Sequence, residues 1–232
     1  MFWQEDESSN LVVSPEDVLD LIFNIECKQL PVDHAHALSE AIKAKLPWLE
    51  QEPLAAIHPI HVAGSQNGWI RADHSPDELI HLSKRTKFTL RIPKERKADA
   101  KQLTGKTLDI AGNCLKIGQP KEKPLSTMGT IFSRFIVCKA DESEEEFLHR
   151  MVEELGQMGV RIRKALCGTE TELHTPEGPL LTRSLMLADL PTEESIRLQQ
   201  QGIGEHRLMG CGIFIPHKGI EAIKKTTDDE NQ

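Results

Sequence analysis

The sequence of 232 residues contains no tyrosine, and aromatic residues make up only 4% of it. The missing tyrosine excludes any active site that uses a phenol hydroxyl, and the low aromatic content disfavours a nucleic-acid site dominated by base stacking. No apolar run reaches the roughly 18 residues that a membrane span needs. The first ten residues are acidic and lack the positive-then-apolar order of a signal peptide. We therefore expect a cytoplasmic protein with no membrane partner.

Metal-binding patterns are also missing. The five cysteines show no CxxC spacing, which indicates reduced thiols and disfavours a zinc site. Six of the ten histidines lie in the first part of the chain, without an HExxH motif. They are His34, His36, His58, His61, His74 and His81. We expect no metal and no other cofactor. Most of these histidines are interpreted as surface or capping residues, with proton transfer or a metal-dependent site as the chemical alternatives.

The formal net charge of −8 disfavours indiscriminate binding to polyanions. The charge is unevenly distributed, because residues 84–101 carry eight basic and two acidic side chains, a local excess of six positive charges. Arg161 and Arg163 form a second basic group, which we expect on one face of a strand. This separation favours a basic surface for a nucleic-acid backbone on an otherwise acidic body. An ordinary solvated strand and helix remain the alternative.

The hydrophobic pattern repeats once along the chain. In the first half we expect strands at residues 18–25, 56–62 and 87–92, helices after Asp33 and at 93–103, a turn at 64–68, and a hairpin around 111–113. In the second half we expect strands at 130–139, 160–166, 180–187 and 213–215, with helices at 144–158 and 191–201. The order β-α-β-β-α-β thus occurs twice.

This repeat predicts an α+β fold of two tandem ferredoxin-like domains with a glycine-rich loop near the C-terminus. The expected domains are residues 1–120 and 125–225, joined by a proline-containing linker at 120–124. Each sheet would bury one face under two helices and leave the other open, where modules of this topology bind RNA. A single larger α+β domain is the alternative.

The glycine-rich loop is the sharpest local motif. Gly202, Gly204, Gly210 and Gly212 fall within eleven residues, together with His206 and Arg207. Such a loop can expose successive backbone N–H groups to a phosphate, and it matches neither a Walker loop nor a dinucleotide fingerprint. A tight turn between helix and strand, which needs glycine for steric reasons, explains it equally well.

Over residues 18–218 these features together resemble the CRISPR repeat-processing endoribonucleases of the RAMP superfamily, most closely the MYXAN subtype of type I systems. The resemblance is carried by the glycine-rich stretch at 202–216, the segment at 30–38 and the block at 56–60. It implies two ferredoxin-like domains and metal-independent cleavage of precursor CRISPR RNA. In that reaction the ribose 2′-hydroxyl attacks the adjacent phosphate and leaves a 2′,3′-cyclic phosphate.

The resemblance also implies site residues. His58 is the first candidate for the acid or base, with His61 and His36 as alternatives, and Lys43 as a candidate to stabilise the transition state. The partner of His58 is unassigned, because relatives often use a tyrosine and this chain has none. The expected RNA-binding residues are Lys84, Arg85, Lys87, Arg91, Arg161, Arg163, Gly202, Gly204, Arg207, Gly210 and Gly212. The expected partner is the repeat hairpin of precursor CRISPR RNA. A non-catalytic subunit that holds this hairpin in a type I effector complex, with other subunits as partners, is the alternative.

Overall fold

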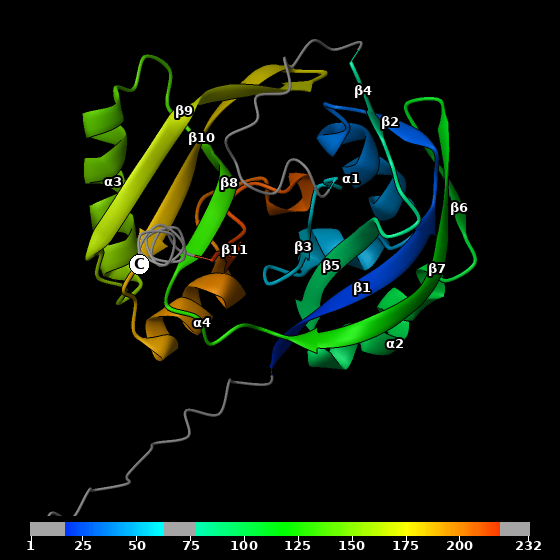
Figure 1. The fold of residues 1–232 in the computed structure, drawn as a ribbon, viewed down its shortest axis with the longest axis horizontal. Helices are drawn as coiled ribbons and strands as arrows, with labels where there is room; N and C mark the ends of the chain where they lie inside the picture. The colour runs from blue at the N-terminus through cyan, green and yellow to red at the C-terminus, as the bar shows by residue number, and fades with distance from the viewer. Residues whose placement is uncertain (1–16, 63–77, 219–232) are drawn as a thin grey trace, which may run out of the picture.

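The computed structural model describes residues 17–62 and 78–218. The chain forms two larger antiparallel sheets, which lie side by side with helices packed against each (Figure 1). The turn expected at 64–68 and His74 lie outside the described residues. Among the helices that the structure describes, none has the length and apolar character needed to cross a membrane.

The first sheet has the order β3-β5-β1-β7-β6. Its strands are β1 (Val18–Glu26), β3 (Ala56–Ile57), β5 (Lys87–Pro93), β6 (Thr107–Ile110) and β7 (Asn113–Pro124), and its helices are α1 (Ala35–Lys43) and α2 (Lys97–Ala100). Taken without β6, the order is that of a ferredoxin-like unit, with the fourth strand beside the first and the second at the far edge. Short 3-10 helices, η1 (Pro47–Gln51), η3 (Lys94–Arg96) and η4 (Lys101–Leu103), and a separate pair of strands, β2 (Gln29–Pro31) and β4 (Leu79–His81), complete this half.

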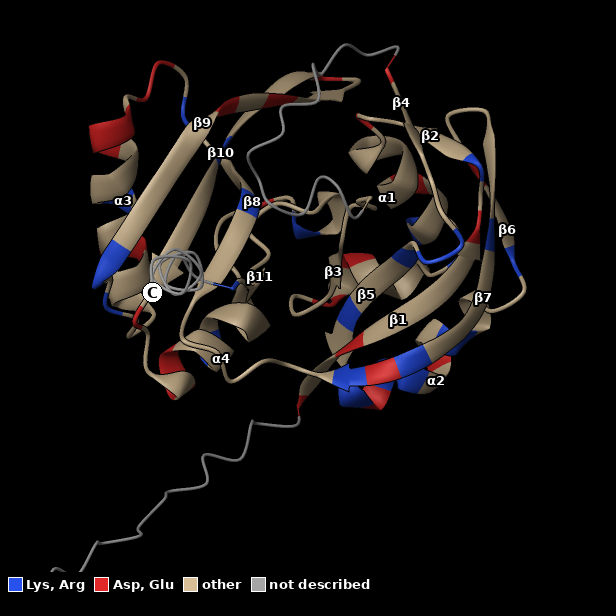
Figure 2. Ribbon diagram, in the orientation of Figure 1, with Lys and Arg blue, Asp and Glu red and all other residues tan. Residues whose placement is uncertain are grey.

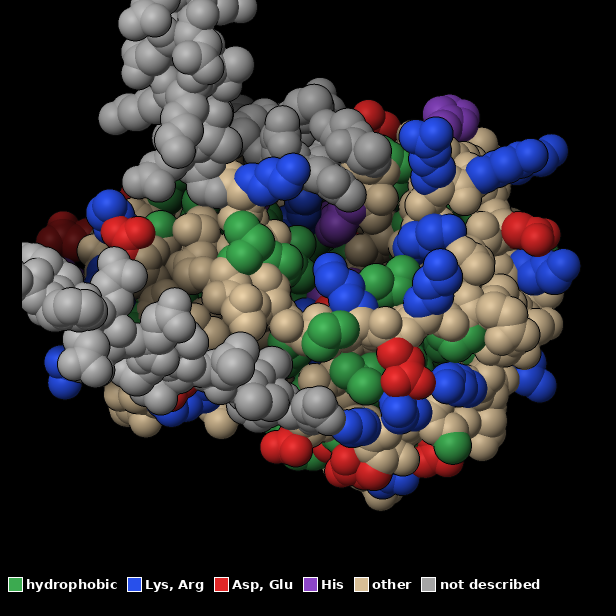
Figure 3. Space-filling model, turned by 60° about the horizontal axis from the view of Figure 1, so that its bottom comes forward, with side chains coloured by type: hydrophobic (Ala, Val, Ile, Leu, Met, Phe, Trp, Pro, Cys, Tyr) green, Lys and Arg blue, Asp and Glu red, His purple; other side chains and the backbone are tan. Residues whose placement is uncertain are grey.

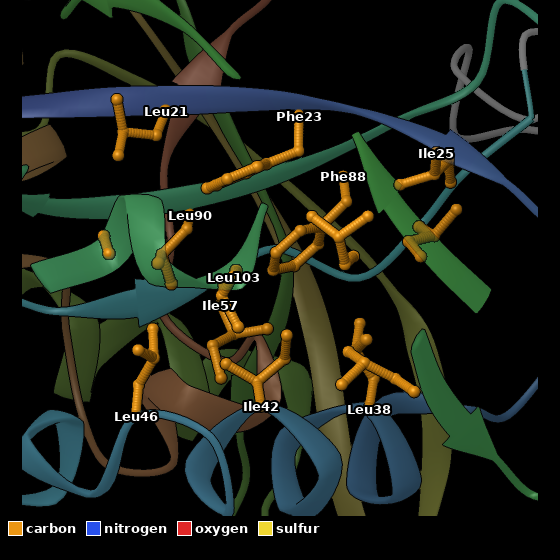
Figure 4. Close-up of a cluster of buried hydrophobic side chains, with 14 of the residues drawn as sticks. Leu21, Phe23, Ile25, Leu38, Ile42, Leu46, Ile57, Phe88, Leu90 and Leu103 are labelled. Atoms are coloured by element: carbon orange, nitrogen blue, oxygen red, sulfur yellow. The ribbon is translucent and has the colours of Figure 1, made fainter. Parts of the chain in front are cut away.

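Side-chain alternation along β1 decides which face of this sheet is buried. Leu21, Phe23 and Ile25 point toward α1, where Leu38 and Ile42 complete the core (Figure 4). Because successive strand residues point to opposite faces, Asp20, Ile22 and Asn24 lie on the face away from α1. This face is buried at Asp20, where the second half packs on it, and exposed at Asn24, and it carries part of the candidate site.

The second sheet has the order β11-β8-β10-β9, which is the ferredoxin-like order without additions. Its elements are β8 (Ile131–Val137), α3 (Glu144–Gln157), β9 (Lys164–Thr175), β10 (Gly178–Ala188), α4 (Thr192–Gln201) and β11 (Ile215–Pro216). A capping box between Ser143 and Glu146 starts α3, and Phe147, Met151 and Leu155 bury its apolar face. The expected fold of two tandem ferredoxin-like units is confirmed.

Local expectations are wrong in several places. The strand expected at 56–62 ends at Ile57. Residues 120–124, expected as a linker, form the end of β7 and pair with β1 from Phe23 to Leu19. Pro120 and Pro124 are tolerated because β6 covers only residues 113–116 of β7, so the rest of the strand has a neighbour on one side alone. The strand expected at 160–166 begins at Lys164 instead and continues to Thr175. Arg161 and Arg163 therefore precede the strand and share no strand face.

Candidate functional site

A buried ion pair joins the two halves of the molecule. The guanidinium of Arg91 donates to both carboxylate oxygens of Asp20, at 2.8 and 3.0 Å, and its Nη1 donates to the carbonyls of Gln199 and Phe214, at 2.8 and 2.9 Å. Burial by itself would raise the pKa of Asp20, but Arg91 and then His58 outweigh it and hold that pKa below its usual value. Arg91 is 0% exposed, and this burial disfavours the expected contact with RNA. Its donors face protein carbonyls from the second half.

His58 stands next to this pair at the end of β3. Its Nε2 lies 3.7 Å from Oδ1 of Asp20, and its side chain is 14% exposed. The Nε2 atom itself is buried and has no hydrogen-bond partner in the described part of the chain. Burial is the main reason that the pKa of His58 falls to about 4. His58 is therefore neutral near pH 7, and its Nε2 is enclosed beside Asp20.

His34 holds the segment that follows His58. The backbone N–H of Ile60 donates to Nε2 of His34 at 2.9 Å, so Nδ1 must carry the ring proton and donate to the carbonyl of Pro31 at 2.8 Å. Burial lowers the pKa of His34, and it lowers the pKa of His61 strongly, with Arg134 of the second sheet adding to the effect there. These contacts fix His34 in a structural role at the joint between the two halves.

Arg207 fastens the glycine-rich loop to the first half. Its guanidinium donates to the carbonyls of Leu54, Ala55, Gln200 and Gln201. Burial lowers the pKa of Arg207 to about 10. The expected RNA contact through Arg207 is at odds with this geometry, because its donors are already engaged with backbone oxygens of two separate segments.

Three of the four expected loop glycines are required by close packing. At Gly210, where φ is 89°, a Cβ would lie 2.3 Å from Cγ of Pro59, and at Gly212 it would lie 1.8 Å from the carbonyl oxygen of Ile203. Gly202 is similarly crowded by Arg207, whereas a Cβ at Gly204 would meet nothing within 4 Å. The N–H groups of residues 209–212 bond to carbonyls of the protein itself. This part of the loop is a tight turn, and it offers no set of N–H groups to a phosphate.

A groove of about 720 Å³ opens between α1, the glycine-rich loop and the turn between β9 and β10. His36 and Lys43 line it from α1, and His206 lines it from the loop. Several carboxylates share the groove, and two of them, Glu40 and Glu50, lie 2.5 and 3.6 Å from Nζ of Lys43. Hydrogen bonding to Glu40 is the main reason that the pKa of Lys43 is raised. His36 is the one expected catalytic histidine that lies in this groove.

Lysines lie on the exposed part of the face of the first sheet that is turned away from α1. Cross-strand pairing puts Lys87 beside Asn24, Lys121 beside Ile22, and Lys123 beside Asp20. Paired residues of antiparallel strands share a face, so Lys87, Lys121 and Lys123 form one surface opposite α1, which we call the lysine face. Figure 3 shows basic side chains gathered on this side of the molecule.

Lys121 and Lys123 were not expected from the sequence, because residues 120–124 were interpreted as a linker. The available signal is the alternation of lysine and glutamate. Glu122 points the other way and pairs with Lys97 and Lys101 of the α2 side, at 2.9 and 3.1 Å (Figure 2). Lys84 and Arg85 lie in the exposed turn before β5 and adjoin the lysine face through Lys87.

Arg161 and Arg163 lie elsewhere. They precede β9, the edge strand of the second sheet, on the side of the molecule farthest from the first sheet (Figure 1). Nη1 of Arg163 donates to the carbonyl of Asp189 at 2.8 Å, and the N–H of Arg161 donates to Glu194 at 2.8 Å. The structure thus separates the two basic groups that the sequence suggested. Over residues 17–62 and 78–218, no three histidine, cysteine or acidic side chains converge as a metal site would require.

Comparison with known proteins agrees with this architecture. A family model described as "Cas6 Crispr" matches residues 19–219. A CRISPR-associated endonuclease Cas6 of Myxococcus xanthus is 29% identical over 198 residues, which is 85% of this chain and 81% of the relative. Among solved structures, a Cas6-related protein of Pyrococcus furiosus superimposes with a TM-score of 0.59 at 13% identity and covers 85% of this chain and 97% of its own. A CRISPR-associated Cas6 protein gives 0.57 at 12% identity and covers 87% and 99% of the two chains. The chain belongs to the Cas6 family of CRISPR repeat-processing endoribonucleases.

Proposed function

We propose that this protein cleaves precursor CRISPR RNA within its repeats, without a metal ion, by attack of a ribose 2′-hydroxyl on the adjacent phosphate. Membership of the Cas6 family and the similarity to a protein named as a CRISPR-associated endonuclease support the reaction class. The observation that carries the proposal in this chain is a groove containing an accessible histidine, His36, beside a rigidly fastened glycine-rich loop.

RNA recognition is proposed to use the lysine face. Lys121 and Lys123 form no salt bridge within the described residues, and Lys87 makes only a polar contact to Asn24, at 2.5 Å. Their charges therefore remain available to phosphates. The repeat hairpin of precursor CRISPR RNA is the proposed partner. Because α1 packs on the opposite face of the first sheet, the RNA has to pass around the molecule to bring its cleaved phosphate from the lysine face into the groove.

His36 is proposed as the general base that removes the 2′-hydroxyl proton. His58 is a weaker candidate, because its Nε2 is buried and the ring lies against Asp20 and Arg91. His61 is half-buried, and burial is the main cause that keeps its pKa well below the usual value. Lys43 is proposed only as a local positive charge, because Glu40 and Glu50 already offset it.

Single-turnover cleavage tests this assignment. Purified protein is mixed with labelled repeat RNA from the host CRISPR array in EDTA, and products are mapped at nucleotide resolution. We expect cleavage in EDTA with a 2′,3′-cyclic phosphate end, and a loss of about 10²-fold or more in rate for His36→Ala. His58→Gln, which keeps a polar side chain at the joint, is the comparison. Cleavage by His36→Ala at the wild-type rate would remove His36 from the mechanism, and no cleavage by wild-type protein would contradict the enzymatic proposal.

A non-catalytic role is the second candidate, and one feature favours it. Glu177 and Glu205 line the same groove as His36, together with other carboxylates, and their charge opposes entry of a phosphate. Under this alternative the protein holds the repeat hairpin for other subunits of a type I effector complex. Tight hairpin binding with no cleavage under single-turnover conditions would select it.

A further inference from the structure

The reaction proposed above needs a second proton-transfer group, and the chain has no tyrosine to supply it. A base removes the 2′-hydroxyl proton, and an acid must protonate the 5′-oxygen as it leaves. The second group has to reach the same phosphate as the first. The groove beside α1 is therefore the place to search for it.

His206 is the other histidine among the residues that line this groove. Its side chain is 42% exposed, whereas the nitrogen of His58 that faces Asp20 is buried. The 3-10 helix η5 (Arg207–Met209), which starts directly after His206, packs against α1 and β3. His36 and His206 thus face one groove from two different elements.

The carboxylate of Glu177 interacts electrostatically with both imidazoles. Glu177 lies in the turn between β9 and β10. Hydrogen bonds to its own N–H and to Thr175 are the main reason that its pKa is below the usual value, and the nearby His36 and His206 lower that pKa further. The turn that carries Glu177 is fastened to the start of α1, because Asp33 accepts from the N–H and the ring of His174 at 2.6 and 2.8 Å. The third wall of the groove is therefore fixed relative to His36.

The backbone at His206 is held in an unusual conformation. Its φ of 60° and ψ of 32° lie in the left-handed region, which is disfavoured for side chains larger than glycine. The N–H groups of Met209 and Cys211 donate to the carbonyl of His206, and Gly210 packs against Pro59. The surrounding loop thus determines the position of His206, as expected for a side chain that must be preorganised.

We infer that His206 is the general acid of the cleavage reaction, with His36 as its base. In this step a ring nitrogen of His36 takes the proton from the 2′-hydroxyl, and the 2′-oxygen forms a bond to phosphorus. The bond from phosphorus to the 5′-oxygen breaks, and the imidazolium of His206 gives its proton to that oxygen. The products are a 2′,3′-cyclic phosphate and a 5′-hydroxyl, with no co-reactant.

The division of roles follows from the surroundings of each ring. Nε2 of His206 lies 4.0 Å from Oε2 of Glu205, which is placed to partner an imidazolium. His36 lies in the first turn of α1, where the N–H groups that have no partner within the helix disfavour a positive charge. The proton donor is therefore assigned to the loop, and the proton acceptor to the helix.

The test uses two substrates with the same repeat sequence. One is ordinary RNA, and the other has sulfur in place of the 5′-oxygen at the cleaved linkage, so that its leaving group needs no proton. The variant is His206→Asn, because asparagine tolerates the left-handed conformation and cannot transfer the proton. His149→Asn, an exposed histidine on α3, is the matched control. Binding of uncleaved RNA, with the attacking 2′-hydroxyl removed, is measured for each protein.

We expect His206→Asn to cut ordinary RNA about 10²-fold more slowly and to recover to within about tenfold of wild type on the sulfur-containing RNA, with unchanged binding. His36→Asn should stay slow on both substrates, and His149→Asn should match wild type. This inference rests on the proposed function, and the two fail differently. If wild-type protein cuts and His206→Asn cuts equally fast, or is equally slow on both substrates, the assignment of His206 is overturned while cleavage stands. If wild-type protein cuts neither RNA, both are overturned.

Discussion

His58 shows how the joint between the two halves sets the protonation of a single residue. In an unfolded chain histidine binds a proton near pH 6.5, whereas burial next to Asp20 and Arg91 gives His58 a pKa of about 4. Between these values the unfolded state holds more protons than the folded state. The contribution of His58 to stability is therefore complete above pH 6.5 and is lost as the pH falls toward 4.

We predict that the free energy of unfolding decreases between pH 6.5 and 4, with about 3 kcal/mol of the loss due to His58. Urea unfolding of wild type and His58→Gln at several pH values measures it. The variant should show a shallower pH dependence, by about one proton. His34 and His61, whose pKa values are also lowered by burial, supply the remainder. Identical pH dependence in wild type and His58→Gln would show that the ring gains a proton without cost in the folded state.

Among the elements, strand β7 presents charged side chains on both of its faces. Lys121 and Lys123 point to the lysine face, and Glu122 points to the side of α2, where it pairs with Lys97 and Lys101. Removing either pair of lysines changes the net charge by the same amount. The two double variants therefore separate a local phosphate contact from the effect of overall charge.

We predict that Lys121→Gln with Lys123→Gln weakens binding of repeat RNA and lowers the dependence of log Kd on log salt by about 1.5, because each of the two phosphate contacts adds roughly 0.7 to 0.9 to that slope. Lys97→Gln with Lys101→Gln should leave the slope unchanged. Fluorescence anisotropy over a range of salt concentrations measures both. Equal slopes for the two double variants would place the RNA away from the lysine face.

The elements that the sequence predicted well are those whose pattern is local. Alternation along β1 and the apolar stripe of α3 locate their buried faces without knowledge of the partner, and Phe23 and Met151 are buried as their spacing requires. The second strand of each ferredoxin-like unit was harder to predict from the sequence. β3 has only two residues, and β9 runs through Gly168. Pro120 and Pro124 made the end of β7 hard to predict. Proline fits there because this part of β7 has a neighbouring strand on one side only, which depends on the whole sheet and cannot be read from the local sequence.

The site was less predictable, because its contacts join distant segments. The carbonyls that enclose Arg91 come from residues 108 and 123 positions further along the chain, so nothing near β5 marks it as buried. The position of His206 opposite α1 likewise depends on the turn at 210 meeting Pro59. Glycine spacing located the loop, but only the packed structure distinguishes an engaged Arg207 from an accessible His206.

For the whole molecule, the ion pair between Asp20 and Arg91 couples the two halves. Arg91 is completely buried and holds the end of α4 and the segment before β11 through the carbonyls of Gln199 and Phe214. Removing one partner of a buried pair leaves an uncompensated charge, which costs about 3 to 5 kcal/mol, whereas removing both costs less. Because the pair lies at the joint, the loss should reach both sheets.

We predict that Asp20→Asn lowers the free energy of unfolding by about 3 kcal/mol or more, and that Asp20→Asn with Arg91→Met is less destabilised than the sum of the two single variants. Urea unfolding of the four proteins gives the coupling, and amide hydrogen exchange locates it. Protection should fall in β1 of the first sheet and in α4 of the second together. Additive losses of stability, or lost protection confined to β1, would mean that the two halves are stabilised independently. The geometry of the groove would then be fixed by Arg207 and by the contact of Gly210 with Pro59 alone.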